Sequence, residues 1–156
     1  MIAFKLYGSA VSGGSKTIGR RKDGTTFVRP ERPGYGDWKK RVAQEAGRVM
    51  AGRPLLEGPL ELRLLFTMVR PKSHVTTRGE LRRHAPAAPI VKPDLTKLTR
   101  GVEDGMTGVV WRDDSQVCRQ QIEKTYGVRV SVAVTVLPLG GTPLSLPGLG
   151  QEEGPR

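Results

Sequence analysis

KPDLTKLTRGVEDGMTGVVWRDDSQV, residues 92–117, places acidic side chains on both sides of a predicted helix. Three apolar residues at helical spacing, Leu98, Val102 and Met106, indicate a helix over residues 95–107. Gly108 follows as its C-terminal stop. Asp94 stands at the N-cap position of this helix, where a short carboxylate is favoured. Asp113 and Asp114 follow the helix in a predicted turn. The two groups of carboxylates would meet if the chain doubles back.

The flanking sequence predicts the other elements of an α+β domain. Alternating apolar residues indicate strands at residues 2–7, 25–29, 60–69, 116–124 and 128–137. An amphipathic pattern indicates a helix over residues 38–50, with Asp37 as its N-cap. Val128 is expected to begin the buried face of the last strand. We therefore predict a small mixed β-sheet with both helices packed on one face.

Length and composition indicate one domain followed by a tail. The domain is expected over residues 1–137, and residues 138–156 are rich in Gly and Pro without periodicity, which predicts a disordered tail. The single cysteine, Cys118, excludes an internal disulfide and a Cys-rich zinc site, and it fits a reducing compartment. No apolar run approaches the roughly 20 residues of a membrane helix. We expect a cytoplasmic protein without membrane contact.

Positive charge dominates residues 1–93, and the chain has a net charge of +11 and a pI near 10.4. Such a surface favours nucleic acid through phosphate neutralisation, whereas a basic surface that serves solubility alone is the alternative. Two basic loops are predicted at residues 8–24 and 71–91, and for the first of them a solvated hairpin is an equal alternative to DNA contact. Candidates for DNA contact in these loops are Lys16, Arg20, Arg21, Lys22, Lys72, Arg78, Arg82 and Arg83.

Carboxylates within an otherwise basic protein suggest a metal site that faces a polyanion. Mg²⁺ prefers oxygen ligands and keeps several waters, so two or three carboxylates and a DNA phosphate suffice to hold it. The same aspartates also have structural explanations, because Asp94 suits an N-cap and Asp113–Asp114 suits an ordinary turn. Spacing alone leaves both explanations open.

The stretch 92–117 resembles the signature of the RusA family of Holliday-junction resolvases, which are common in phages and prophages. In that signature a basic residue, Pro and Asp precede a helix with an internal acid, and a Trp-x-Asp-Asp-x-Gln-Val run closes the motif. The matching residues are Lys92, Pro93, Asp94, Leu98, Asp104, Trp111, Asp113, Asp114, Gln116 and Val117. The resemblance implies a RusA-like fold over residues 1–137. It also implies an endonuclease, dependent on Mg²⁺ or Mn²⁺, that resolves four-way or branched DNA in recombination and repair.

The resemblance also implies roles for individual residues. Asp94 and Asp114 would be metal ligands, with Asp113 as a nearby helper. Arg100 occupies the position of a catalytic lysine of the family, and a guanidinium can hold a phosphate but cannot give up its proton. Asp104 is expected to pair with Arg100 four residues earlier. Two further residues complete the set, with Lys97 expected to contact DNA and Trp111 expected to pack in the core.

One position departs from the family pattern, because Thr96 stands where the family has a second acid. A neutral hydroxyl is a weak ligand, and Glu103 lies too far along the helix to replace the missing carboxylate. Two alternatives therefore stay open: cleavage with Asp94, Asp113 and Asp114, or a catalytically impaired protein that binds junctions. A basic RNA-binding protein of ribosomal type is a third alternative, which leaves the acidic pattern as coincidence.

Resolution of a four-way junction needs two symmetric cuts, so the resemblance implies a homodimer with two sites. Gly101 and Gly105 lie on one face of the predicted helix and weaken it by roughly 1 kcal/mol each, which indicates close approach by another element. We expect this glycine face and the valine-rich strand at 128–137 to supply dimer contacts. The distribution of the family implies action in the cytoplasm of a bacterial cell, with a phage as one origin.

Overall fold

The computed structural model describes residues 1–13, 18–28 and 32–140. Their elements are β1 (Ile2–Tyr7), β2 (Ile18–Arg20), β3 (Thr26–Val28), α1 (Tyr35–Met50), β4 (Leu60–Val69), the 3₁₀ helix η1 (Lys72–His74), α2 (Leu95–Met106), the 3₁₀ helix η2 (Asp114–Gln116), β5 (Val117–Gly127) and β6 (Ser131–Pro138). The predicted tail lies outside the described residues from 141 onward.

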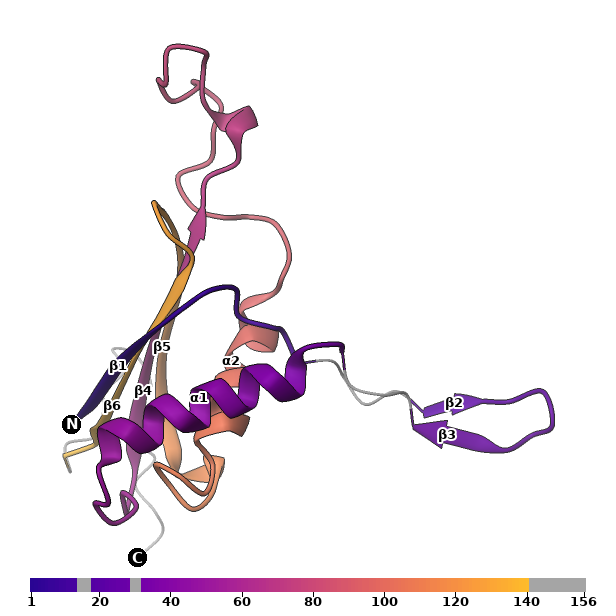
Figure 1. The fold of residues 1–156 in the computed structure, drawn as a ribbon, viewed down its shortest axis with the longest axis vertical. Coiled ribbons are helices and arrows are strands. Elements are labelled where there is room, and N and C mark those ends of the chain that lie inside the picture. Colours follow the sequence, from indigo (N-terminus) through magenta and orange to yellow (C-terminus); the bar gives the residue numbers. More distant parts are fainter. Residues whose placement is uncertain (14–17, 29–31, 141–156) are drawn as a thin grey trace, which may run out of the picture.

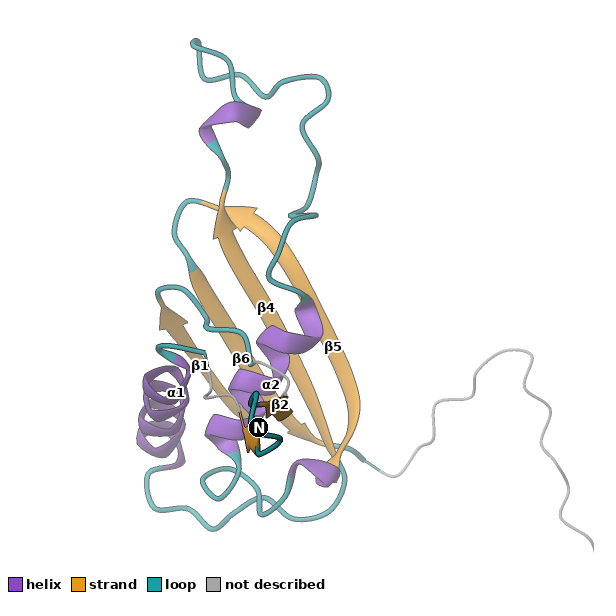
Figure 2. Cartoon of the chain, turned by 90° about the vertical axis from the view of Figure 1, so that its right-hand side faces the viewer, coloured by secondary structure: helices purple, strands orange, loops and turns teal. Residues whose placement is uncertain are grey.

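Four strands form a mixed sheet in the order β1-β6-β4-β5, in which β4 and β5 are parallel and the other pairs are antiparallel. Figures 1 and 2 show α1 and α2 side by side on one face of this sheet. The predicted α+β architecture, with a mixed sheet and helices on one face, is confirmed. None of the helices among the described residues is long and apolar enough to cross a membrane.

Alternating apolar residues of β4 form the core of the sheet. Leu60, Leu62, Leu64 and Phe66 are at most 3% exposed, and all four point toward the helices. The antiparallel partners of Leu62, Leu64 and Phe66 on β6 are the buried residues Val136, Val134 and Val132. The predicted bounds of β4 are confirmed, since period-2 burial leaves no freedom to shift the strand by one residue.

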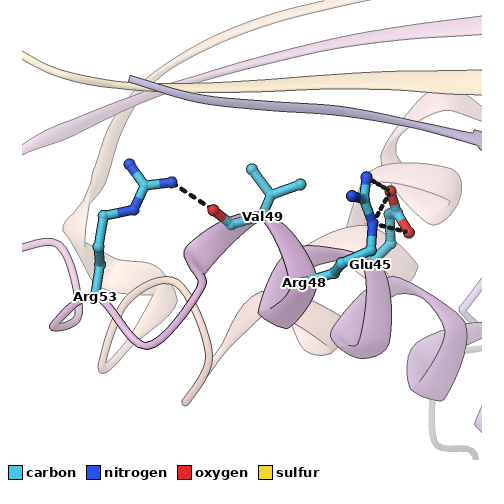
Figure 3. A network of polar contacts seen from close by, with 4 residues as sticks. All are labelled: Glu45, Arg48, Val49 and Arg53. Carbon is cyan, nitrogen blue, oxygen red and sulfur yellow. Dashed lines mark hydrogen bonds and ion pairs between the residues drawn. The ribbon is translucent and has the colours of Figure 1, made fainter.

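The helix α1 begins at Tyr35 rather than at the predicted residue 38, and its N-cap is Gly34. Gly34 has a φ of 81°, a left-handed conformation that glycine adopts easily. Asp37 therefore lies in the first turn, where its charge suits the helix dipole, and its prediction as N-cap is wrong. At the other end of α1, Arg48 pairs with Glu45 at 2.6 Å and Arg53 donates to the Val49 carbonyl (Figure 3).

Two predictions about strands need correction. The last strand begins at Ser131, and Val128 is fully exposed in the turn between β5 and β6. Residues 18–20 and 26–28 form a hairpin of their own, separate from the main sheet. The hairpin turn is built by Asp23, whose carboxylate accepts hydrogen bonds from the amide (2.9 Å) and hydroxyl (2.7 Å) of Thr25. A hairpin was one of the two alternatives for this segment, and the Asp-Gly pair at 23–24 is a strong hairpin signal that favours it.

The helices α1 and α2 touch through glycine. A Cβ on Gly105 would lie 2.7 Å from Val42 Cβ and 2.9 Å from the Lys39 carbonyl, and a Cβ on Gly101 would lie 2.9 Å from the Val11 carbonyl. The predicted close approach is thus confirmed, and the approaching element is α1 of the same chain. This glycine face and the buried valines of β6 are internal, so the prediction that they form dimer contacts is wrong.

We predict that Gly105→Ala lowers the free energy of unfolding by about 1–3 kcal/mol, because the added methyl forces α1 and α2 apart. Urea-induced unfolding measures the change. Gly36→Ala is the matched control, since Gly36 lies in α1 with no atom near its absent Cβ. The control should keep or raise stability, by up to about 1 kcal/mol. Equal stability of Gly105→Ala and the wild type would contradict the packing.

Candidate active site and DNA-binding loops

Asp94 occupies the predicted N-cap position of α2, yet its carboxylate makes no capping hydrogen bond. The side chain is half exposed and pairs with Lys97, with Oδ2 lying 3.2 Å from Nζ. The predicted helix start is therefore right, while the predicted capping bond is wrong. Because the helix does not use this carboxylate, it is available at the surface for a ligand.

Asp113 builds the turn that presents Asp114. The Asp113 carboxylate accepts a hydrogen bond from the Ser115 amide at 2.9 Å, and the Ser115 side chain, followed by this amide, lowers the pKa of Asp113. Gln116 completes a capping box by accepting from the Arg112 and Asp113 amides, and it donates to the Leu56 carbonyl at 3.0 Å. Asp114 begins η2 and is exposed. The two neighbouring aspartates thus differ: the first is held by the turn and the second faces solvent.

Trp111 and Asp104 are tied to the scaffold beneath this turn. The Trp111 ring is fully buried, and its Nε1 donates to the Thr107 hydroxyl at 3.2 Å, which confirms the predicted packing role. Asp104 accepts a hydrogen bond from the Tyr35 hydroxyl at 2.7 Å. In the described part of the chain this contact stands in place of the predicted pair with Arg100.

Glu103 is a further acid of the site, which sequence reasoning set aside. Its half-buried carboxylate accepts a hydrogen bond of 2.6 Å from Gln120 on β5. Burial raises the pKa of Glu103, and the nearby negative charges of Asp114 and Asp104 raise it further, while Arg100 opposes them. Glu103 therefore lies beside Asp114 and not beside Thr96. Its place three residues after Arg100, on the same helix face, was the available signal.

The acids fall into two places along α2. Asp94 and Glu103 are nine residues apart, which corresponds to about 14 Å of helix. Asp114 belongs to the Glu103 end, as its electrostatic effect on Glu103 shows. Among residues 1–13, 18–28 and 32–140, no group of three or more His, Cys, Asp or Glu could hold a metal ion together. Within one chain, Asp94 therefore does not join Glu103 and Asp114 in a shared cluster.

The basic residues lie on two projections from the core. Arg20, Arg21 and Lys22 belong to the β2–β3 hairpin, and Figure 1 shows this hairpin and the 71–91 loop extending away from the sheet. The loop candidates are all exposed: Lys72, Arg78, Arg82 and Arg83. Lys97 lies on α2 beside Asp94. The remaining candidate, Lys16, lies outside the described residues.

The base of the 71–91 loop is held against β5. The Arg70 guanidinium stacks 4.1 Å from the centre of the Tyr126 ring and donates to the Pro86 carbonyl at 2.9 Å. The His74 ring meets the same tyrosine edge-on at 5.8 Å. Within the loop, Val75 and Leu81 form an isolated bridge. The loop therefore has an ordered base that directs its arginines outward.

Comparison with known families gives this arrangement its context. The family described as Endodeoxyribonuclease RusA matches residues 11–136. The chain belongs to the RusA family. A further relative is an uncharacterized protein, YqaN of Bacillus subtilis (strain 168), which is 28% identical over 140 residues that cover 86% of this chain and 94% of YqaN.

Membership of the RusA family identifies the chain as one of a group of endodeoxyribonucleases, with DNA as the implied substrate. The match includes the hairpin, the 71–91 loop and the whole of α2, η2 and β5. The acids and the two basic projections therefore belong to one RusA-type unit. The roles of the individual site residues stay predictions.

We predict that Glu103→Gln raises the melting temperature near neutral pH. When folding raises the pKa of a carboxyl group, ionisation of that group lowers the free energy of unfolding. The loss begins as the pH rises past the unfolded pKa, about 4.3, and it is complete and constant above the folded pKa. Glutamine removes the charge and can still accept the Gln120 hydrogen bond. Thermal unfolding as a function of pH should show that the difference in melting temperature between Glu103→Gln and the wild type disappears below about pH 4.

Glu123→Gln is the control for this measurement, because it removes the same charge from an exposed position on β5. It should leave the pH dependence of the melting temperature unchanged. An equal effect of both variants would contradict the specific coupling of Glu103 to Asp114.

Proposed function

We propose that this RusA-family protein resolves Holliday junctions by paired, symmetric, Mg²⁺-dependent cleavage of DNA phosphodiesters. The observation that carries the proposal is the RusA match over residues 11–136, which spans exposed Asp114, its neighbour Glu103 and two basic projections. Family membership alone supplies the endodeoxyribonuclease activity. The junction substrate, the metal and the symmetry of the two cuts are the parts that need experiments.

The acids at the η2 end of α2 fit a magnesium ion by their chemistry. Mg²⁺ takes carboxylate oxygens from one or two residues and completes its shell with water and substrate phosphate. Asp114, with Glu103 beside it, offers such a pair, and their mutual repulsion is relieved by a cation. A bound Mg²⁺ would polarise the phosphodiester and lower the pKa of an attacking water, leaving a 5′-phosphate and a 3′-hydroxyl.

The other residues of the site bind and orient the DNA. Arg100 carries a permanent charge on the exposed face of α2 and would hold the phosphate at the cut. Asp113 fixes the turn that presents Asp114. Asp94 is the proposed acid at the other end of the site, the start of α2, where Lys97 and the adjoining basic loop would bring the DNA backbone. The hairpin and loop arginines would contact phosphates, which gives affinity that falls with salt.

Two symmetric cuts require two copies of the site, so we propose a two-fold homodimer on the junction. A four-way junction has two equivalent strands at its exchange point, and a two-fold axis matches them. The β6 valines and the glycine face of α2 are used inside each chain. Contacts between subunits would therefore use other surfaces.

A second function is favoured by one observation. Thr96 is exposed in the first turn of α2 and carries no charge, and the described residues contain no group of three or more His, Cys, Asp or Glu that could hold a metal ion. A protein with this surface could bind four-way junctions through its basic projections without cutting them. The two functions differ in whether nicks are formed once metal is supplied.

We predict that the protein, mixed with a synthetic four-way junction and Mg²⁺, produces paired nicks in opposite strands. Asp94→Asn and Asp114→Asn should each reduce the nicking rate by at least about 100-fold, since even residues that only support metal ligands cost 10–100-fold. Asp37→Asn is the matched control, because Asp37 is an exposed acid on α1 that pairs only with Lys40. Gel electrophoresis of end-labelled strands measures the rates.

The result that would contradict cleavage is tight junction binding without nicks at any Mg²⁺ or Mn²⁺ concentration. It would establish the non-catalytic function. Better competition by linear RNA than by the junction would instead favour an RNA-binding protein.

We also predict that Thr96→Asp lowers the Mg²⁺ concentration needed for half-maximal cleavage by about fourfold. Thr96 lies seven residues before Glu103 on α2, about 10 Å of helix, and a carboxylate at that distance from a divalent cation gains about 0.8 kcal/mol in a water-like dielectric. Thr96→Asn is the control, because it has a similar shape and no charge. Identical metal dependence of Thr96→Asp and Thr96→Asn would show that the missing acid has no effect on this site.

A further inference from the structure

Lys124 lies on the helix side of β5. In the parallel pairing of β4 with β5, Phe66 stands opposite Lys124 and Leu62 opposite Gln120. Both β4 residues are buried toward the helices, so the alternation of the strand turns Gln120 and Lys124 toward α2. A half-buried lysine on this side needs acceptors for its ammonium group, because burial removes part of its hydration.

The ammonium group of Lys124 finds these acceptors in the segment that precedes Asp94. Its Nζ donates to the Val91 carbonyl at 3.0 Å and to the Pro93 carbonyl at 3.2 Å. Val91 is the last residue of the long basic loop, and Pro93 is the residue directly before Asp94. One side chain of the sheet therefore holds both the end of the loop and the start of α2.

A second contact holds α2 at its other end. Gln120 donates to Glu103 at 2.6 Å, and it stands four residues before Lys124 on the same strand. Four residues of strand span roughly 13 Å, close to the length of helix between Asp94 and Glu103. Lys124 and Gln120 therefore fix the two ends of the acidic face of α2 on a single rigid strand.

We propose that Lys124 is a positioning residue of the active site, which holds the Val91 and Pro93 carbonyls and thereby sets the position of Asp94. The effect of Lys124 on the nicking rate rests on the proposed cleavage function, whereas its positioning of the segment from Val91 to Asp94 does not. A lysine suits the task because its compact ammonium has three donors, of which the two carbonyls take two. Neutral replacements of similar length keep the packing of the stem but lose both bonds.

The test compares Lys124→Met with Lys124→Arg and the wild type. Hydrogen exchange should accelerate in Lys124→Met at residues 91–98. This segment includes the Leu98 amide, which donates to the Asp94 carbonyl (3.1 Å) at the start of α2. The nicking rate at saturating junction should fall at least tenfold, with the KM for the junction changed by less than threefold. Lys124→Arg, which keeps the charge and the donors, should restore most of the rate.

Lys40→Met is the matched control for the loss of one positive charge, because Lys40 is exposed on α1 and its Nζ lies 4.0 Å from the exposed Asp37 carboxylate. It should behave as the wild type in both measurements. Should Lys124→Met fail to fold, as judged by thermal unfolding, Lys124→Gln takes its place in the same comparison.

Two results would overturn the inference. One is unchanged hydrogen exchange at residues 91–98 in Lys124→Met, and the other is a loss of rate that Lys124→Arg does not recover. If the wild-type protein makes no nicks, the proposed cleavage fails, and hydrogen exchange alone then decides the role of Lys124.

Discussion

The contact between α1 and α2 at Gly101 and Gly105 sets the arrangement of the site. Because no side chain fits between Gly105 and Val42, the two helices approach backbone to backbone. The rotation of α2 about its own axis is thereby fixed. Its apolar stripe, including Leu98 and Val102, must then face the sheet, and the remaining side must face solvent. The acidic and basic residues of α2 are exposed in one direction as a result of packing on the other two sides.

The parallel pairing of β4 with β5 determines where each acid lies. Parallel strands need a crossover connection, and here the crossover contains the basic loop, α2 and η2. The chain leaves the end of β4, and α2 then runs back so that β5 can begin beside the start of β4. Asp94 therefore lies toward the end of the two strands, while Asp114 lies just before the start of β5. Their separation follows from topology.

Patterns of buried residues predicted the parts of this fold that local sequence determines. The bounds of β4 and the start of α2 follow from apolar periodicity and from the position of Asp94. The start of α1 was predicted incorrectly. Gly34, and not the polar residue Asp37, is the N-cap, so the helix begins earlier. Val128 continued an alternating pattern that the turn before Ser131 interrupts. In the site, helical spacing from Arg100 could place Glu103 on the same helix face, but its neighbours Gln120 and Asp114 come from β5 and η2, which only the folded chain brings together.

A neutral side chain could fill every structural role of Glu103 in this fold. A glutamine would accept the same hydrogen bond from Gln120, and it would avoid both the cost of burial and the repulsion from Asp114 and Asp104. Groups with such perturbed pKa values gather at functional sites. A carboxylate at position 96 would stand nearer the start of α2. The negative charge of this site is therefore concentrated at the η2 end of the helix, where a cation on a DNA phosphate would offset it.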